Sequence, residues 1–515
     1  MLRRTSAYLD LVSSSCLRST EANLSLFAIL RVSVFAAALL ALAAPVAVAA
    51  EKVAAGKLQW APCPDVKGAQ CAGIVVPVDA EKPKGPTFRL RLGRVTATDP
   101  ARRKGVLVIL PGGPGVGIQG ELGSGHSQTA RLRQVFDVVT FDPRGIGRSS
   151  PIRCAPNAVP KAPAPSSTPP TRAQFNAIMS RNAVLFRSCF QLSGALMGHL
   201  SAIDTAADVE QIRRALTPNE GLRAYGGSYG SLYGEMYLER YPTHVKALVL
   251  DGLVDHSINQ PTDVFRTVLA VNVSFRRFSA WCTSTAPCAL HGKNVAGVFD
   301  DIVRKAPVTR IAVPQMFAAG KNPDVGWPAI AKMMAEMSRG DMTTLNALTK
   351  AASAGRGSAA EDPQLLAGKN GLYAGVVCAD FGPENNYDAL MPMGKSAMRE
   401  APRFAWKYWD WTPLAHSTSG ALDCTGWSRP PTNPPRTLRV GRHTNVMVAS
   451  SRYDPATSFT NALSVHHQIP GSAFLIFEGD GHQSFFQSNC ALEAMIRFWK
   501  DPHAVDSTTV CHSER

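Results

Sequence analysis

Unbroken runs of apolar residues recur along the chain, separated by stretches with helical spacing. Three runs, at residues 105–110 (GVLVIL), 136–141 (FDVVTF) and 245–250 (VKALVL), are rich in β-branched and aromatic side chains, and two more follow at 444–449 (TNVMVA) and 473–477 (AFLIF). Such runs are typical of strands buried on both faces of a parallel sheet. Helical segments between them predict a mostly parallel sheet flanked by helices.

Shorter patterns complete this prediction. Residues 73–78 and 87–95 alternate like the first strands of a sheet, and residues 222–225 form a short strand. Amphipathic spacing predicts helices over 205–216, about 231–240 and 491–499.

The alternation of strand-like apolar runs and helical segments stops between residues 256 and 435. This stretch has helical segments, Gly/Ser loops and an aromatic cluster comprising Phe404, Trp406, Tyr408, Trp409 and Trp411. We expect an inserted, mainly helical cap between two strands of the sheet. The predicted organisation is a signal peptide (1–50), a first core part (51–255), the cap (256–435) and a second core part (436–515).

The first fifty residues resemble an export signal. Basic residues precede the apolar run 32–42, and small residues follow at 47–50, as a signal peptidase requires. The run is short for a membrane span, so we expect its removal and no stable span afterwards. Retention as an anchor, or a start codon further downstream, is the alternative. The prediction is a secreted or periplasmic protein.

Cysteine usage agrees with export. Ten of the eleven cysteines lie after the leader, and an even number in an exported chain indicates disulfides. Their spacing suggests sequential pairing, a hypothesis because sequence does not fix connectivity: Cys63–Cys71, Cys154–Cys189, Cys282–Cys288, Cys378–Cys424 and Cys490–Cys511. No CxxC pair occurs, so no metal site is expected.

The formal charge of +15 comes from scattered residues rather than a basic block. No nucleic-acid motif accompanies it, so we expect a solvated basic surface and no nucleic-acid partner. Loose attraction to anionic cell envelopes is the alternative.

A nucleophile motif lies between a predicted strand and a helix. Gly226-x-Ser228-x-Gly230 in this context forms a sharp turn that holds the serine in a strained conformation. The helix amino terminus behind Ser228 adds positive potential where an oxyanion would develop.

A serine hydroxyl needs a base near neutral pH. His482 follows a buried strand late in the chain, and it is the best of the twelve histidines; a surface or packing role is the alternative. For His466 and His467 the surface or packing role is preferred.

The expected acid is Asp454, directly after the strand at 444–449. A carboxylate there would accept the second N–H of the imidazole and stabilise imidazolium. The rival is Asp480, two residues before His482, which we expect to shape the loop instead.

Two N–H donors are expected for the oxyanion. One is the backbone of Tyr229, directly after the nucleophile. The other is Gly113, since Pro114 has no N–H; a simple tight turn is the alternative. Asp142 and Arg144 are expected to brace neighbouring loops.

The motifs together resemble one family. The GGPG turn, DPRGIGRS, GGSYGS, the Asp-Pro at 454–455 and the Gly-His at 481–482 are similar to those of the prolyl aminopeptidase and tripeptidyl aminopeptidase family of α/β-hydrolases, over most of residues 57–511. The early Trp60…Cys63…Cys71 segment and the cysteine-containing tail resemble its secreted tripeptidyl-aminopeptidase-like branch.

The resemblance implies the α/β-hydrolase fold, a triad of Ser228, Asp454 and His482, and oxyanion donors at Gly113 and Tyr229. It also implies a peptide substrate, with short peptides or single residues released from free N-termini. Pro111 stands where many prolyl aminopeptidases have His, and the 256–435 insertion does not match their cap, so proline specificity is not implied.

An aminopeptidase must pair the substrate ammonium with carboxylates. Candidate partners are Asp251, Asp255, Asp380 and Glu384, although each fits a structural role better. The aromatic cluster fits packing better than an apolar pocket.

Two other functions stay open: a carboxylesterase or lipase-like hydrolase with the same triad, and a non-catalytic binding protein on this scaffold. No cofactor is expected, because the chain has neither a zinc-spaced His/Cys set nor a dinucleotide fingerprint.

Overall fold

The computed structural model describes residues 58–513 apart from 124–126, 160–167, 306–312, 315, 323–324, 348–361 and 410–419. The predicted signal peptide and Trp411 lie outside the described residues. Within them, no helix combines the length and the apolar character that a membrane crossing requires.

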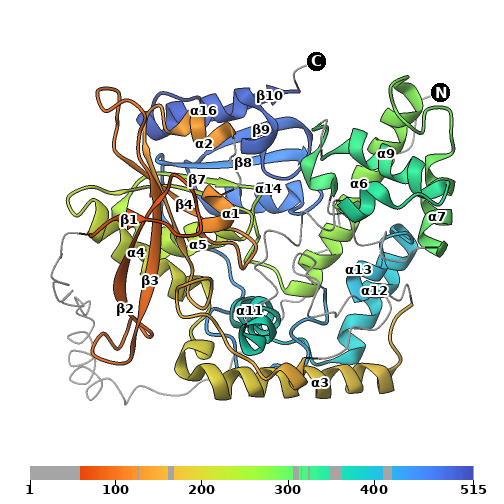
Figure 1. Cartoon of the computed structure of the whole chain (residues 1–515), viewed down its shortest axis with the longest axis horizontal. Coiled ribbons are helices and arrows are strands. Elements are labelled where there is room, and N and C mark those ends of the chain that lie inside the picture. Colours follow the sequence, from red (N-terminus) through yellow and green to blue (C-terminus); the bar gives the residue numbers. More distant parts are fainter. Residues whose placement is uncertain are drawn as a thin grey trace, which may run out of the picture. The chain divides into compact units, whose positions relative to one another are not determined.

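A ten-stranded sheet forms the centre, in the order β1-β2-β3-β5-β4-β6-β7-β8-β9-β10 (Figure 1). The first three strands pair antiparallel, and all pairs from β5 to β10 are parallel, which confirms the predicted sheet. The strands are β1 (Ala61–Pro62), β2 (Gln70–Pro77), β3 (Thr87–Val95), β4 (Val106–Leu110), β5 (Asp137–Asp142), β6 (Leu222–Gly227), β7 (Val245–Asp251), β8 (Val446–Tyr453), β9 (Ala473–Asp480) and β10 (Thr508–His512).

The apolar runs form strands because the side chains of each run pack into two hydrophobic cores, one on each face of the sheet. Along β4, Val108 and Leu110 enter the core on one face, while Leu107 and Ile109 enter the core on the other. Successive strand residues point to opposite faces, so a run apolar at every position suits a sheet covered on both sides.

Helices cover both faces of the sheet. The core of one face includes residues of α4 (Ala202–Leu216), α5 (Tyr229–Arg240) and α14 (Phe459–Gln468). The core of the other face includes residues of α2 (Ser127–Leu132) and α16 (Asn489–Lys500).

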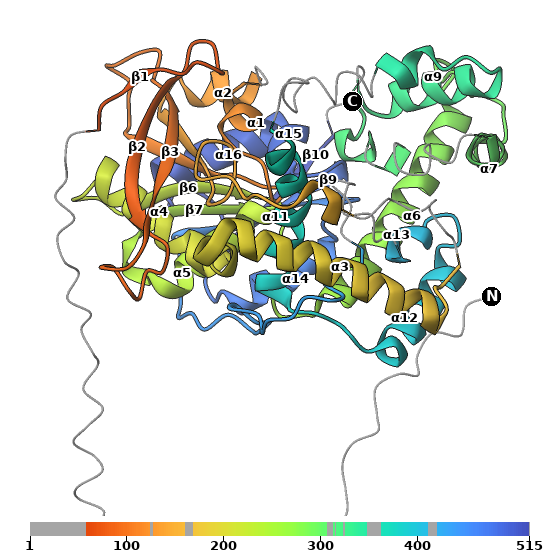
Figure 2. The same cartoon turned by 60° about the horizontal axis from the view of Figure 1, so that its bottom comes forward.

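The long segment between β7 and β8 is mainly helical, as predicted. It contains α6 (Gln260–Ser284), α7 (Val295–Lys305), the short η4 (Phe317–Ala319), α9 (Trp327–Ser338), α11 (Pro363–Phe381), α12 (Tyr387–Glu400) and α13 (Trp406–Trp409). Most of these helices share a third hydrophobic core and lie to one side of the sheet (Figures 1 and 2).

Helix α11 is the exception within this segment. Its Leu372, Val376 and Val377 join the core on the sheet rather than the third core. Conversely, α3 (Arg172–Ser193), which precedes the segment in sequence, supplies Phe175 and Ile178 to the third core. The insertion is therefore interleaved with the sheet domain through α3 and α11.

All five disulfides join the pairs that the spacing suggested. They are Cys63–Cys71, Cys154–Cys189, Cys282–Cys288, Cys378–Cys424 and Cys490–Cys511. The last one ties α16 to β10, a strand that the sequence pattern did not reveal.

Candidate active site

Ser228 lies at the sharp turn between β6 and α5. Its backbone has φ +56° and ψ −130°, a conformation that non-glycine residues rarely adopt. Its N–H donates to the Asp251 carbonyl at 3.0 Å, which ties the turn to the end of β7. The side chain is only partly buried. The turn thus presents a hydroxyl at the carboxyl edge of the sheet.

The flanking glycines are required by space. A Cβ on Gly226 would lie 2.4 Å from the Gly230 carbonyl oxygen, and one on Gly230 would lie 2.1 Å from the Leu110 carbonyl oxygen. Both distances are below any real contact, so the backbones on either side of Ser228 approach each other only because no side chain intervenes.

His482 and Asp454 are in direct contact. The imidazole Nδ1 lies 2.9 Å and 3.0 Å from the two carboxylate oxygens of Asp454. The Asp454 side chain is fully buried, whereas 17% of the His482 side chain is exposed. The hydroxyl of Thr457 also reaches this pair, at 3.1 Å from Asp454 Oδ2 and 3.4 Å from His482 Nδ1. Thr457 was not among the residues predicted from the sequence.

The pair changes the basicity of the imidazole. Burial alone would lower the pKa of His482, but the charge of Asp454, the hydrogen bond to it and the charge of Asp251 outweigh burial. The pKa of His482 is therefore raised above its ordinary value, which suits the predicted role of accepting a proton.

Ser228 lies beside this pair on neighbouring strand ends. Gly227 is in register with Asp251, so Ser228 and Gly252 follow at adjacent positions. A Cβ on Gly252 would lie 3.2 Å from both His482 Cε1 and Asp454 Oδ2. Within the described part of the chain, no hydrogen bond joins the Ser228 hydroxyl to the His482 ring. The structure thus brings the predicted base and acid into contact and puts the predicted nucleophile at the adjoining position.

The GGPG turn lies against the serine. A Cβ on Gly112 would lie 3.2 Å from Ser228 Cβ and 3.8 Å from its Oγ. Gly113 has φ +108°, a conformation that favours glycine. Tyr229 is the first residue of α5, and the N–H groups of a first helical turn have no partner within the helix. Of the two predicted oxyanion donors, Tyr229 directly follows Ser228, and Gly113 directly follows the glycine that lies against it.

The loop that carries His482 is held by two groups for which the sequence did not predict this role, Asp251 and the Ala318 carbonyl. Asp251 accepts hydrogen bonds from the Ser484 N–H, the Ser484 hydroxyl and the Phe485 N–H at 2.8–3.0 Å. The His482 N–H donates to the Ala318 carbonyl of η4 at 2.8 Å. Asp251 is fully buried and occupied by these donors, so it is not available to a substrate ammonium.

The other acids considered for the ammonium are also mostly engaged. Asp255 is buried and pairs with Arg266 at 3.1 Å. Asp380 is buried and accepts from the Tyr229 hydroxyl at 2.6 Å. Of the four candidates only Glu384 is partly exposed.

The residues expected to brace loops do so. Asp480 pairs with Arg277 of α6 at 2.5 Å and 3.0 Å, which confirms that it shapes the loop before His482. Arg144 binds both carboxylate oxygens of Asp208 at 2.8 Å. Asp142 accepts from the Ile118 N–H and the Arg148 N–H.

Packing explains the aromatic cluster and His466, whereas His467 lies exposed on α14. The described members of the aromatic cluster, Phe404, Trp406, Tyr408 and Trp409, are buried. His466 stacks on Phe474 and contacts the Ser472 hydroxyl at 2.9 Å.

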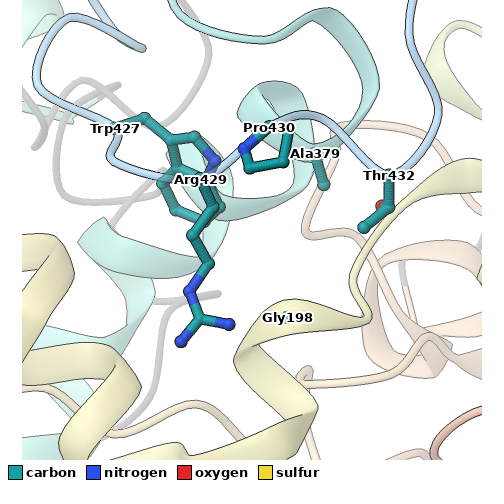
Figure 3. A pocket seen from close by; sticks show the side chains of 6 residues that line it. All are labelled: Gly198, Ala379, Trp427, Arg429, Pro430 and Thr432. Atoms are coloured by element: carbon teal, nitrogen blue, oxygen red, sulfur yellow. The ribbon is translucent and has the colours of Figure 1, made fainter.

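A cavity of about 300 Å³ lies away from these groups, between η2 (Gly194–Gly198), the end of α11 and residues 427–432. Figure 3 shows its lining of Gly198, Ala379, Trp427, Arg429, Pro430 and Thr432. None of the predicted site residues lines it.

Comparison with known families agrees with the fold. Residues 105–322 match the family described as alpha/beta hydrolase fold, and residues 414–511 match the family described as TAP-like protein. The chain has the α/β-hydrolase fold. The first match contains Ser228 and the GGPG turn of this hydrolase, and the second contains Asp454 and His482.

Curated relatives span most of the hydrolase. It is 28% identical to the serine protease Hip1 of Mycobacterium tuberculosis, over 85% of this chain and 88% of that protein. It is 28% identical to the tripeptidyl aminopeptidase of Streptomyces coelicolor, over 84% and 81%. It is also 27% identical to the carboxylesterase B of Mycobacterium tuberculosis, over 85% of each.

Proposed function

We propose that this hydrolase is an exported serine aminopeptidase that releases short peptides or single residues from free N-termini. The contact between His482 and Asp454, at the strand end next to the strained Ser228, carries the proposal. The relatives named serine protease and tripeptidyl aminopeptidase support a peptide substrate.

In the proposed mechanism the Ser228 hydroxyl attacks the scissile carbonyl, and His482 Nε2 takes its proton. Asp454 stabilises the resulting imidazolium, which then protonates the leaving amine. An acyl-enzyme remains on Ser228. Water, deprotonated by His482, attacks this ester and releases the acyl group with its free amino terminus.

The developing oxyanion would be bound by the N–H groups of Gly113 and Tyr229. Donors that are fixed before the reaction stabilise the transition state more than the ground state. The conformation of Gly113 and the position of Tyr229 at the start of α5 support these roles.

Export is supported by the five disulfides, because thiols oxidise outside the cytoplasm. We propose that the mature chain is secreted or periplasmic.

A carboxylesterase is the second candidate, favoured by the relative named carboxylesterase B. The two functions share the triad and differ in the substrate that the site accepts. Turnover of one tripeptide anilide with a free amino terminus, its N-acetylated counterpart and a short acyl ester separates them. An aminopeptidase cleaves the free anilide and loses at least tenfold in kcat/KM on the blocked one. Equal rates on both anilides, or activity on the ester alone, would contradict the aminopeptidase.

A further inference from the structure

Asp380 is a buried carboxylate at the junction of the insertion and the nucleophile turn. It lies one residue before the end of α11, and none of its surface is exposed. Its Oδ2 accepts from the Tyr229 hydroxyl at 2.6 Å, and its Oδ1 accepts from Asn433 Nδ2 at 2.7 Å and from the Ala202 N–H at 2.8 Å. Donors from three separate parts of the chain therefore converge on this side chain.

The first of these donors belongs to the residue directly after the proposed nucleophile. Tyr229 is 5% exposed, and its ring packs edge-on against Tyr233 with centroids 5.7 Å apart. Asp380 fixes the far end of the same side chain. A side chain held along its length and at its tip restrains its own Cα, and with it the direction of the backbone N–H.

Asp380 is itself held from several directions. The disulfide Cys378–Cys424 closes two residues before it. Its backbone carbonyl lies 3.0 Å from His256 Nε2, which lies 3.0 Å from the Asn433 carbonyl as well. The carboxylate is thus a fixed point supplied by the insertion and not a mobile surface group.

We propose that Asp380 is a positioning residue for the oxyanion hole: through the Tyr229 hydroxyl it holds the Tyr229 N–H in the direction that the transition state requires. This inference rests on the proposed serine-hydrolase function. It assigns to the insertion a part in transition-state stabilisation, in addition to any part in substrate selection.

The charge state of Asp380 is expected to affect the pH dependence of kcat. Burial raises the pKa of Asp380 to about 7, although hydrogen bonds from Tyr229, Asn433 and Ala202 oppose the shift. The titratable and charged groups that face this network are Tyr229 and Tyr233 on α5, Tyr373 on α11, Asp204 on α4, and His256 with Arg436 in the loops. As the pH falls through about 7, the anion is lost and its hold on Tyr229 weakens. The acid limb of kcat then contains two protonations, one at Asp380 and one at His482.

The test compares Asp380→Ala, Asp380→Asn and Tyr229→Phe in the full chain. Asp380→Ala and Tyr229→Phe are expected to lower kcat by about 10- to 100-fold with KM within about twofold, because oxyanion donors act in the transition state. Asp380→Asn keeps an acceptor for the Tyr229 hydroxyl, so its kcat falls between that of Asp380→Ala and that of the wild type. Its acid limb reduces to a single protonation. Asp301→Asn on the exposed face of α7 is the matched control, with unchanged kcat.

Labelling by a fluorophosphonate counts the competent sites in each variant, so that loss of folded protein is not mistaken for loss of kcat. Wild-type kcat per labelled site in both Asp380→Ala and Tyr229→Phe, or a two-proton acid limb in Asp380→Asn, would overturn the positioning role while leaving the proposed function intact. A wild-type chain that turns over no substrate and takes no label would overturn both.

Discussion

The carboxylate of Asp454 accepts hydrogen bonds from the His482 imidazole and from the N–H groups of Ala456, Thr457 and Gln483. A buried charge is tolerated only where such donors replace water. The donors come from the residues just after Asp454 and from the residue after His482. Local chain geometry at two strand ends therefore satisfies this carboxylate with donors and aims it at the His482 imidazole.

Replacing Asp454 by Asn separates the two candidate acids. Asp454→Asn is expected to lower kcat by about 10⁴-fold, since an amide neither selects the tautomer of His482 nor stabilises imidazolium. Asp480→Asn, the matched change two residues before the histidine, should cause a much smaller loss because Asp480 engages Arg277. Steady-state kinetics of both variants decides the assignment, and a larger loss in Asp480→Asn would refute it.

The pH dependence follows from the raised pKa of His482. The base must be neutral to accept a proton, so kcat/KM falls as the pH drops through this pKa. Because Asp454 and Asp251 raise the pKa, the loss begins at a higher pH than the ordinary value of about 6.5 would give. A pH–rate profile measures it, and activity that persists well below pH 6 would contradict the assigned base.

At the scale of elements, close backbone approach decides where the serine lies. Strand β6 and helix α5 meet at a turn where Gly230 touches the Leu110 carbonyl at the end of β4. Insertion elements then meet the same edge of the sheet: Arg277 of α6 pairs with Asp480 and lies 3.5 Å over the Tyr453 ring, and η4 accepts the His482 N–H.

Gly230→Ala tests the turn. The added methyl would lie 2.1 Å from the Leu110 carbonyl oxygen, so β4 and α5 must separate, with an expected loss of about 3 kcal/mol in the free energy of unfolding. Gly441→Ala is the matched control, because nothing lies within 4 Å of a Cβ there. Denaturant unfolding compares the two variants. Equal stability would show that the turn is looser than described.

Arg277→Ala tests whether the contacts of α6 with Asp480 and Tyr453 hold the loops that carry His482 and Asp454. The Asp480 side chain is only 3% exposed, so removal of its partner leaves a buried charge and is expected to destabilise the fold by about 2 kcal/mol. Because Asp480 precedes His482 and Tyr453 precedes Asp454, kcat should also fall several-fold. Arg276→Ala, at the exposed neighbouring position of the same helix, should leave both unchanged. If Arg277→Ala matches Arg276→Ala in both thermal unfolding and kcat, the contacts of Arg277 do not hold these loops.

Across the whole molecule, the sheet was predictable because β4 to β9 are buried on both faces and each contributes apolar side chains to both cores. Strand β10 was not, since only Val510 and Cys511 in it are apolar and the disulfide to Cys490 ties it to α16. Long-range packing also escaped prediction: nothing in the local pattern of α11 tells that it covers the sheet rather than the insertion.

At the candidate site, too, local sequence patterns predicted some residues, whereas long-range contacts decided others. Ser228, Asp454 and His482 each follow a strand, which made them visible in the sequence. Ala318 and Thr457 contact His482 from distant segments of the chain, and Asp251 at the end of β7 accepts hydrogen bonds from the residues after His482. Their signal exists only in three dimensions, because it depends on which loops the folded sheet brings together.

Ser228 as a nucleophile activated by His482 and Asp454 can be tested directly by its chemistry. The most direct measurement is the rate of fluorophosphonate labelling with peptide mapping of the adduct. One adduct is expected, on the peptide that contains Ser228, formed at least 100-fold more slowly in His482→Ala and absent in Ser228→Ala. An adduct on another residue, or undiminished labelling in His482→Ala, would contradict it.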